Sequence, residues 1–237
     1  MADETFCVKA IVLKRQPFKE NDNKITVYSL EKGKMELAVR GSKKISSKLS
    51  GHIEPMSLVN IMVVRGKQFN YAGSSVSEDC YAVIKSDLQR LQIAGRAVKI
   101  FDTIVKLDQE DRDLFYLLQE FLEILNQKDL GDFDYNLFLS FFIFKFLALL
   151  GHGPELYSCV ECKSDILPQG NVFDFRSGGL SCGKCCDREN GLVISESAIK
   201  LLRINNTQEL SSLLKIKISK TLSKEVIKIV SSFYLSI

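Results

Sequence analysis

Histidine is scarce in this sequence, and the common catalytic motifs are absent. The 237 residues include only two histidines. The chain has no GxxxxGK[ST] phosphate loop, no GxSxG nucleophile elbow and no HExxH metalloprotease motif. His52 lies in a turn between Ser50 and Pro55 that has no nucleophile near it in sequence. The sequence therefore predicts a protein that is not an enzyme.

Long hydrophobic runs and a signal-like leader are also absent. The most apolar stretch, Leu137–Leu150, contains Lys145 and is shorter than the roughly 20 apolar residues that span a bilayer. The seven cysteines are an odd number, which does not suit a disulfide framework. Cys7 and Cys80 have no partner in sequence and are expected to be small, buried residues. We therefore expect a cytoplasmic protein with no membrane association, in which the apolar stretch is a buried helix.

Two CxxC pairs occur in the last third of the chain. Cys159 and Cys162 form the first pair, and Cys182 and Cys185 form the second. Each pair places two sulfur atoms on one tight turn, and two such turns complete the tetrahedral ligand set that Zn²⁺ prefers. Four thiolate ligands leave no position for water, so we predict one structural Zn²⁺ per chain and not the metal of a hydrolase or nuclease. Cys186 is the alternative fourth ligand, although the CxxC spacing favours Cys185.

The first 78 residues have the pattern of β-strands. The candidate strands are Phe6–Leu13, Lys24–Leu30, Met35–Val39, Leu58–Val64 and Gln68–Val76. Gly33 lies between the second and third candidates, where it suits a hairpin turn. Five short strands predict a five-stranded OB-fold β-barrel over residues 1–78, with an SH3-like barrel as the alternative.

After Ser77 the pattern becomes helical. Two apolar stripes have helical spacing: Leu88, Leu91, Ala94, Val98, Phe101 and Val105, then Leu114, Leu117, Leu118, Phe121, Leu122 and Leu125. Asp111 with Asp113, and Asp132 with Asp134, are placed to begin helices. The predicted fold class is therefore α+β: the barrel is followed by an α-helical domain, residues 79–237, that carries the zinc module as an insertion at about 154–190.

Many cations of the predicted barrel lie in one segment, from Lys32 to Lys48. The net charge of the chain is only +3, so affinity for nucleic acid depends on how the charge is distributed. The candidate DNA-binding residues are Arg40, Lys43, Lys44, Lys48, Lys34, Arg15, Arg65 and Lys67. A loop after the third strand would lie beside the groove that single strands occupy in OB folds. On charge alone, a solvated loop without a ligand is an equal alternative.

Four aromatic residues are candidates for stacking on nucleic-acid bases. They are Phe18, Tyr28, Phe69 and Tyr71. Aromatic side chains stack on bases in many proteins that bind single strands. For each of the four, a place in the core or at the rim of the barrel is the more usual role.

Three blocks of the sequence resemble a known protein family. The first block contains Glu20-Asn21-Asp22, residues 27–33, Val39-Arg40-Gly41-Ser42-Lys43-Lys44 and residues 51–55; the second runs from Phe146 to Gly151 and on to Cys159 and Cys162; the third contains Phe173-Asp174-Phe175, Ser177 to Cys182, and Cys185. In this order the blocks resemble the bacterial RecO family of DNA repair proteins. The resemblance spans most of the chain and implies an OB barrel, a helical domain and a zinc-binding module.

The resemblance also implies a function. RecO-like proteins are non-catalytic mediators of recombinational repair that bind single- and double-stranded DNA and anneal complementary strands. They act with RecR to load RecA onto single strands coated with SSB, at the nucleoid of the cytoplasm. They also contact the acidic, apolar tail of SSB through a pocket that the sequence alone does not map. The alternative is an RNA-binding protein with an OB fold and a zinc ribbon, acting in translation or transcription.

Overall fold

The computed structural model describes residues 5–127, 134–186 and 191–237. Its internal contacts divide the chain into two compact units, residues 1–130 and 131–237. This division differs from the expected boundary between residues 78 and 79, because the first helices pack with the barrel. The two units are described separately.

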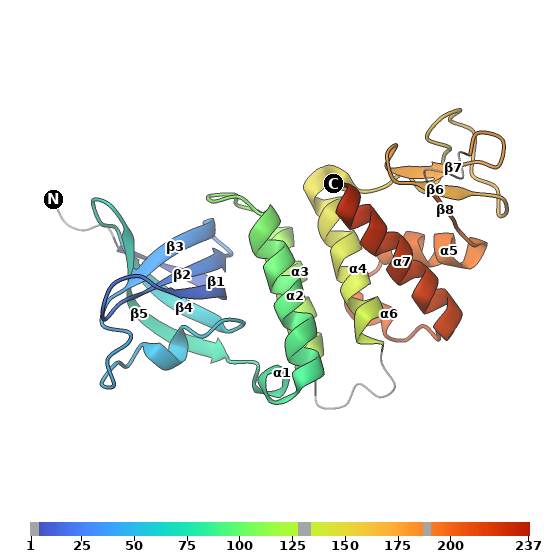
Figure 1. Ribbon diagram of the computed structural model, residues 1–237. Helices are drawn as coiled ribbons and strands as arrows, with labels where there is room; N and C mark the ends of the chain where they lie inside the picture. Colours follow the sequence, from blue (N-terminus) through green and yellow to red (C-terminus); the bar gives the residue numbers. More distant parts are fainter. Residues whose placement is uncertain (1–4, 128–133, 187–190) are drawn as a thin grey trace. The chain divides into compact units, whose positions relative to one another are not determined.

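The first unit begins with a closed, five-stranded barrel (Figure 1). Its strands are β1 (Thr5–Pro17), β2 (Asn23–Ser29), β3 (Gly33–Val39), β4 (Leu58–Val64) and β5 (Asn70–Asp79). Their order around the barrel is β1-β2-β3-β5-β4, and β4 also pairs with β1. The pair β3–β5 is parallel and the other pairs are antiparallel. The five expected strands and the OB-like barrel are therefore confirmed.

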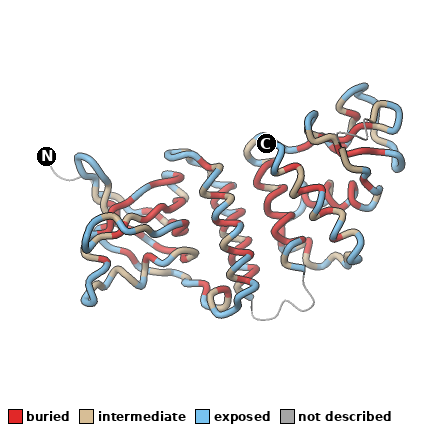
Figure 2. The backbone as a smooth tube through the Cα atoms, in the orientation of Figure 1, coloured by how far each residue is buried: buried red, intermediate tan, exposed pale blue. Residues whose placement is uncertain are grey.

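Apolar residues on alternate positions of the strands fill the barrel. The buried core contains Val8, Ala10, Val12, Ile25, Val27, Met35, Leu37, Val39, Ile53, Val59, Ile61, Val63 and Ala72. Figure 2 shows that buried positions recur along the strands, whereas the loops between them are mostly exposed. The strands are thus fixed by burial of one face, and the loops between them are left free for other roles.

Three α-helices complete the described part of the first unit: α1 (Ala82–Ser86), α2 (Leu88–Ile104) and α3 (Arg112–Leu125). The Asp111 side chain accepts hydrogen bonds from the backbone N–H groups of Asp113 and Leu114, so it caps α3 as expected. Phe101 of α2 contacts Tyr28 of β2 edge to face, with the ring centroids 4.8 Å apart. The α3 stripe is buried throughout, but Leu88 at the start of the α2 stripe is 72% exposed.

The described part of the second unit contains four further helices and one wide turn. They are α4 (Tyr135–Leu147), the turn η2 (Ala148–His152), α5 (Glu196–Thr207), α6 (Leu210–Leu213) and α7 (Lys220–Ser236). Asp134 caps α4 through the N–H groups of Asn136 and Leu137, whereas Asp132 lies outside the described residues. The 18 residues from Tyr135 to His152 are long and apolar enough to cross a membrane. However, α4 is mostly buried and packs against α5 and α7, as the sequence predicts for a core helix.

The segment between α4 and α5 forms a small sheet of its own. Its strands are β6 (Val172–Asp174), β7 (Gly179–Ser181) and β8 (Gly191–Val193), in the order β7-β6-β8. Phe173 of β6 contacts Phe233 of α7, with the ring centroids 5.4 Å apart. The expected module therefore interrupts the helical part of the chain; residues 187–190 near its end lie outside the described part. The sheet itself is too short to have been predicted from strand periodicity.

Candidate metal centre and nucleic-acid interface

The four cysteines of the two CxxC pairs converge on one point. The sulfur atoms of Cys159, Cys162, Cys182 and Cys185 all lie within 4.8 Å of one another. The Sγ atoms of Cys162 and Cys182 are 3.8 Å apart. Tetrahedral zinc with Zn–S bonds of about 2.3 Å requires S–S separations of about 3.8 Å. The cluster therefore has the donor set and the size to hold a tetrahedral metal ion.

Short backbone hydrogen bonds close each cysteine pair into a turn. The backbone N–H of Lys163 donates to the carbonyl oxygen of Cys159 (3.0 Å), and that of Cys185 donates to Cys182 (3.0 Å). The N–H of Cys182 also points at the sulfur of Cys159, at 3.3 Å. These hydrogen bonds thus hold the two turns so that they face each other.

The thiols of the cluster differ in acidity. Hydrogen bonds from the hydroxyl and the N–H of Ser164 lower the pKa of Cys162 to about 6. Hydrogen bonding to Cys162 and then to Cys182 raises the pKa of Cys185 to about 12. Cys185 therefore holds a proton that the thiolate of Cys162 accepts, and a bound metal ion would replace that proton.

The remaining cysteines lie outside the cluster. The Sγ of Cys186 lies 3.6 Å from the carbonyl oxygen of Gly183, and it is not among the four sulfur atoms that converge. Cys7 and Cys80 are exposed, so the expectation that they are buried was wrong. Cys7 lies on an outward-facing position of β1, where the alternation of the strand turns it away from the barrel core.

The loop after β3, residues 40–48, is fastened to the turn between β1 and β2. We call it the basic loop. The N–H of Gly41 donates to Asp22 Oδ1 (2.8 Å), and the N–H of Lys43 donates to the carbonyl oxygen of Asn21 (3.1 Å). The buried Ser42 hydroxyl accepts hydrogen bonds from the backbone and the side chain of Asn23. These contacts give the basic loop a fixed position at one end of the barrel.

The candidate cations are not equally available to a ligand. Lys44, Lys48 and Lys67 are exposed, and their ammonium groups have no partner among the described residues. Lys43 is also exposed, but its Nζ donates to the carbonyl oxygen of Lys19 (2.7 Å) and so helps to hold the turn. Arg15 donates to the carbonyl oxygen of Ser50 (3.2 Å).

Aromatic residues from two loops meet at the same end of the barrel. Phe18, in the β1–β2 turn, contacts Phe69, in the β4–β5 loop, edge to face with a centroid distance of 5.3 Å. Phe69 is 43% exposed. Lys19, which the sequence prediction omits, places its ammonium 5.6 Å from the Phe18 ring. Its position beside Phe18 in a turn is the signal that would have identified it.

Two other cations lie on aromatic rings of the barrel. The guanidinium of Arg40 lies 4.1 Å from the centroid of the Tyr71 ring, which it covers, and that of Arg65 lies 5.7 Å from the Phe6 ring. Tyr28 is buried and donates a hydrogen bond from its hydroxyl to the carbonyl oxygen of Asp111, so it is not available for stacking. The exposed Phe69 and its half-buried neighbour Phe18 are therefore the candidates that a base could reach.

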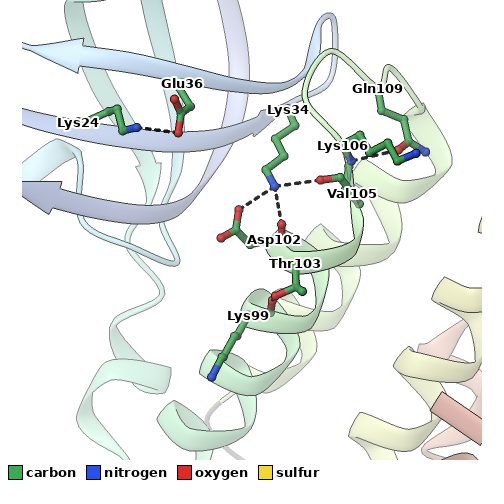
Figure 3. A network of polar contacts seen from close by, with 9 residues as sticks. All are labelled: Lys24, Lys34, Glu36, Lys99, Asp102, Thr103, Val105, Lys106 and Gln109. Atoms are coloured by element: carbon green, nitrogen blue, oxygen red, sulfur yellow. Dashed lines mark hydrogen bonds and ion pairs between the residues drawn. The ribbon is translucent and has the colours of Figure 1, made fainter. Parts of the chain in front are cut away.

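Lys34 has a structural role that the charge pattern did not predict. Figure 3 shows its Nζ directed at α2, where it pairs with Asp102 Oδ1 (2.9 Å) and donates to the carbonyl oxygens of Asp102 and Val105. The residue is buried. Lys34 is the second residue of β3 and Arg40 follows the last, so the two cations belong to opposite ends of the strand. Lys34 is therefore not available to contact DNA.

Comparison with known proteins identifies the family. Residues 1–75 match the family model "Recombination protein O N terminal", and residues 85–236 match "Recombination protein O C terminal". Curated relatives named "DNA repair protein RecO" include those of Desulforamulus reducens (28% identity over 94% of this chain and 86% of the relative) and Clostridium perfringens (26% over 95% and 89%). The relative from a Roseiflexus species is 29% identical over 92% of this chain and 76% of its own length. With both domain models matched in order, the chain belongs to the RecO family of DNA repair proteins.

Proposed function

We propose that this protein is a non-catalytic, cytoplasmic mediator of recombinational DNA repair. In this role it binds single- and double-stranded DNA, anneals complementary strands, and acts with RecR to load RecA onto single strands coated with SSB. Membership of the RecO family supports the repair role. The particular activities and partners rest on the family resemblance and on the barrel surface described above.

The observation that carries the DNA-binding part is the contact of Phe18 with Phe69 beside Lys19 and the basic loop. OB folds bind oligonucleotides with the loops that follow β1 and β4, and these are the loops that supply the two rings. The fastened basic loop presents Lys44 and Lys48 without ion-pair partners in the described structure. Stacking surfaces flanked by cations are the usual means of binding single strands without reading their sequence.

Annealing requires no catalytic side chain. Lys and Arg contacts neutralise phosphates on two strands and raise their local concentration, and such contacts are independent of sequence. This chemistry suits a chain with two histidines and no common catalytic motif. It also predicts strong dependence on salt.

We further infer that the cysteine cluster holds Zn²⁺. Four thiolates in a closed tetrahedron favour zinc, and they leave no site for substrate. The ion would join the two turns that carry the cysteine pairs. Its binding energy would therefore stabilise the module.

The test is annealing of complementary strands that have been coated with SSB, without nucleotide or magnesium, at about 50 and 200 mM salt. The test variant is Lys44→Glu, because Lys43→Glu would also break the hydrogen bond to Lys19. Lys106→Glu, at an exposed lysine just after α2, is the matched control. We expect annealing that weakens with salt and is lost only in Lys44→Glu. Equal annealing by both variants would refute the role of the basic loop, and tighter binding of RNA than of DNA with the same sequence would favour the RNA-binding alternative.

A further inference from the structure

The second unit has a basic surface that the barrel interface does not involve. It consists of Lys215, Lys217, Lys220, Lys224 and Lys228, and we call it the α7 lysine stripe. All five residues are exposed. On α7 itself, Lys220, Lys224 and Lys228 are four residues apart, so they lie along one side of the helix.

The charge of the chain is concentrated in two segments, one in each unit. Residues 215–228 contain five lysines and one acidic residue, Glu225, for a net charge of +4. Residues 32–48 contain six cations and Glu36, for a net charge of +5. Because the whole chain carries only +3, the remaining residues carry a net charge of −6. The α7 lysine stripe is therefore a local exception to an otherwise acidic background.

The lysines of the stripe are not engaged within the protein. None forms an ion pair in the part of the chain that the structure describes. Two carboxylates near the stripe have other partners: that of Glu225 accepts hydrogen bonds from the N–H (2.6 Å) and the hydroxyl (2.9 Å) of Ser195, and that of Asp134 accepts one from the hydroxyl of Ser223. The stripe therefore keeps its positive charge available for an external anion.

Helix stability does not explain where these lysines lie. Cations stabilise a helix near its carboxyl end, whereas Lys220 is the first residue of α7 and Lys224 is in its second turn. The other side of α7 is buried through Val226, Ile229, Val230 and Phe233. Since α7 has no free apolar face, it lacks what an interfacial membrane helix inserts into lipid. A hydrated polyanion fits the stripe better.

We propose that the α7 lysine stripe is a second nucleic-acid site, which binds the phosphates of a second DNA strand while the barrel holds the first. This inference rests on the proposed function, because a protein that anneals strands must hold two of them. It adds a location for the second strand and the residues that contact it. Binding through Lys side chains alone reads no bases, which suits a strand of any sequence.

The test counts how many short single strands each chain binds. Strands of about ten nucleotides are short enough for a single OB-fold site, and non-complementary sequences prevent pairing. The test variant is Lys224→Glu with Lys228→Glu. The matched control reverses two exposed lysines of the first unit, Lys99 in α2 and Lys106 just after it, whose ammonium groups likewise have no partner among the described residues. The variant Lys224→Arg with Lys228→Arg keeps the charge and serves as the rescue.

We expect the wild type to bind two strands per chain. The control, with Glu in place of Lys99 and Lys106, and the variant Lys224→Arg with Lys228→Arg should also bind two. The variant Lys224→Glu with Lys228→Glu should bind one. The loss of two phosphate contacts should weaken second-strand binding at least about tenfold and lower its salt slope by about 1.4. First-strand affinity should change less than about twofold, and Lys44→Glu should remove the barrel site instead.

Three outcomes would overturn the inference. If the wild type binds only one strand, and Lys44→Glu abolishes that binding, the protein has the proposed barrel site but no second site. A Glu variant that still binds two strands shows that the stripe serves another partner, such as an acidic peptide. A folded wild type that binds no strand would instead refute the proposed function itself.

Discussion

The ammonium nitrogen of Lys34 lies 2.9 Å from Asp102 Oδ1, and this ion pair joins strand β3 to helix α2 within the first unit (Figure 3). The same nitrogen donates to the carbonyl oxygen of Val105, at 2.9 Å, so the cation also satisfies carbonyl groups at the carboxyl end of α2. Because the pair is largely withdrawn from solvent, removal of one partner should cost more stability than removal of one partner of a surface ion pair.

We expect Asp102→Ala to destabilise the first unit by about 2–4 kcal/mol, because it leaves the Lys34 ammonium buried without its countercharge. The control is Glu36→Ala, which removes one partner of the more exposed Lys24–Glu36 pair (2.9 Å) and should cost less than about 1 kcal/mol. Urea unfolding followed by circular dichroism measures both free energies, and amide hydrogen exchange locates the loss in β3 and α2. Equal costs for the two variants would contradict the structural role of Lys34.

Gly33 fixes the approach of the α2–α3 connection to the barrel. Its φ is +61°, and a Cβ built there would lie 2.0 Å from the backbone oxygen of Gln109. Gly33→Ala should therefore cost about 2–4 kcal/mol, from both backbone strain and overpacking. Gly51→Ala is the control: a Cβ at that position would meet no atom within 4 Å, and the change should be neutral or stabilise by up to about 1 kcal/mol. Thermal unfolding of the two variants distinguishes these effects, and an unchanged midpoint for Gly33→Ala would contradict the close approach.

Metal binding to the cysteine cluster should weaken as the pH falls. The pKa of Cys162 is lowered to about 6 by Ser164, so its thiolate persists above pH 6 and is lost as the pH falls through that value. The pKa of Cys185 is raised to about 12 by its hydrogen bonds to Cys162 and Cys182. Its thiol is therefore protonated at physiological pH, and a metal ion must displace that proton when it binds. Zinc affinity should therefore fall with decreasing pH throughout, and more steeply below about pH 6, where a second proton competes.

A competition assay with a chromophoric chelator, run between about pH 5.5 and 7.5, measures this dependence. Cys186→Ser should keep one equivalent of zinc, because its sulfur lies outside the converging four. Cys162→Ser should lose it and lower the stability of the module. Retention of tight binding by Cys162→Ser, or affinity that does not vary with pH, would contradict the four-thiolate assignment.

The sequence predicted the barrel well because its signals are local. Alternating apolar residues such as Ile25 and Val27 identify strands from neighbours alone. The role of Lys34 could not be predicted in this way, because its partner Asp102 is far along the chain and only folding brings the two together. All cations of residues 32–48 contribute alike to a charge count, although Lys34 is buried and Lys44 is exposed.

The cysteine cluster was predictable for the opposite reason. The CxxC spacing is itself the geometry of the ligand turn, so Cys159 and Cys162 indicate the site without knowledge of the fold. The short strands beside it carry no such signal. Likewise, the contact of Phe18 with Phe69 depends on how two loops meet at one end of the barrel, which strand patterns do not specify.

The Phe18–Phe69 contact leads to a prediction about strand preference. If Phe69 stacks on an unpaired base, Phe69→Leu should lower affinity for single-stranded DNA at least about fivefold, since base stacking contributes roughly 1–3 kcal/mol. Leu keeps an apolar contact with Phe18, so the loops should remain in place. Affinity for double-stranded DNA should change less than about twofold, because paired bases are already stacked on their neighbours.

The salt slope should be unchanged, because no phosphate contact is removed. Lys44→Glu, by contrast, removes a phosphate contact, so it should lower the salt slope for both single- and double-stranded DNA. Titration of strands that carry 2-aminopurine measures stacking and affinity together, and Phe69→Tyr, which keeps the ring, should bind like the wild type. An equal loss for single and double strands in Phe69→Leu would mean that the ring only holds the two loops together.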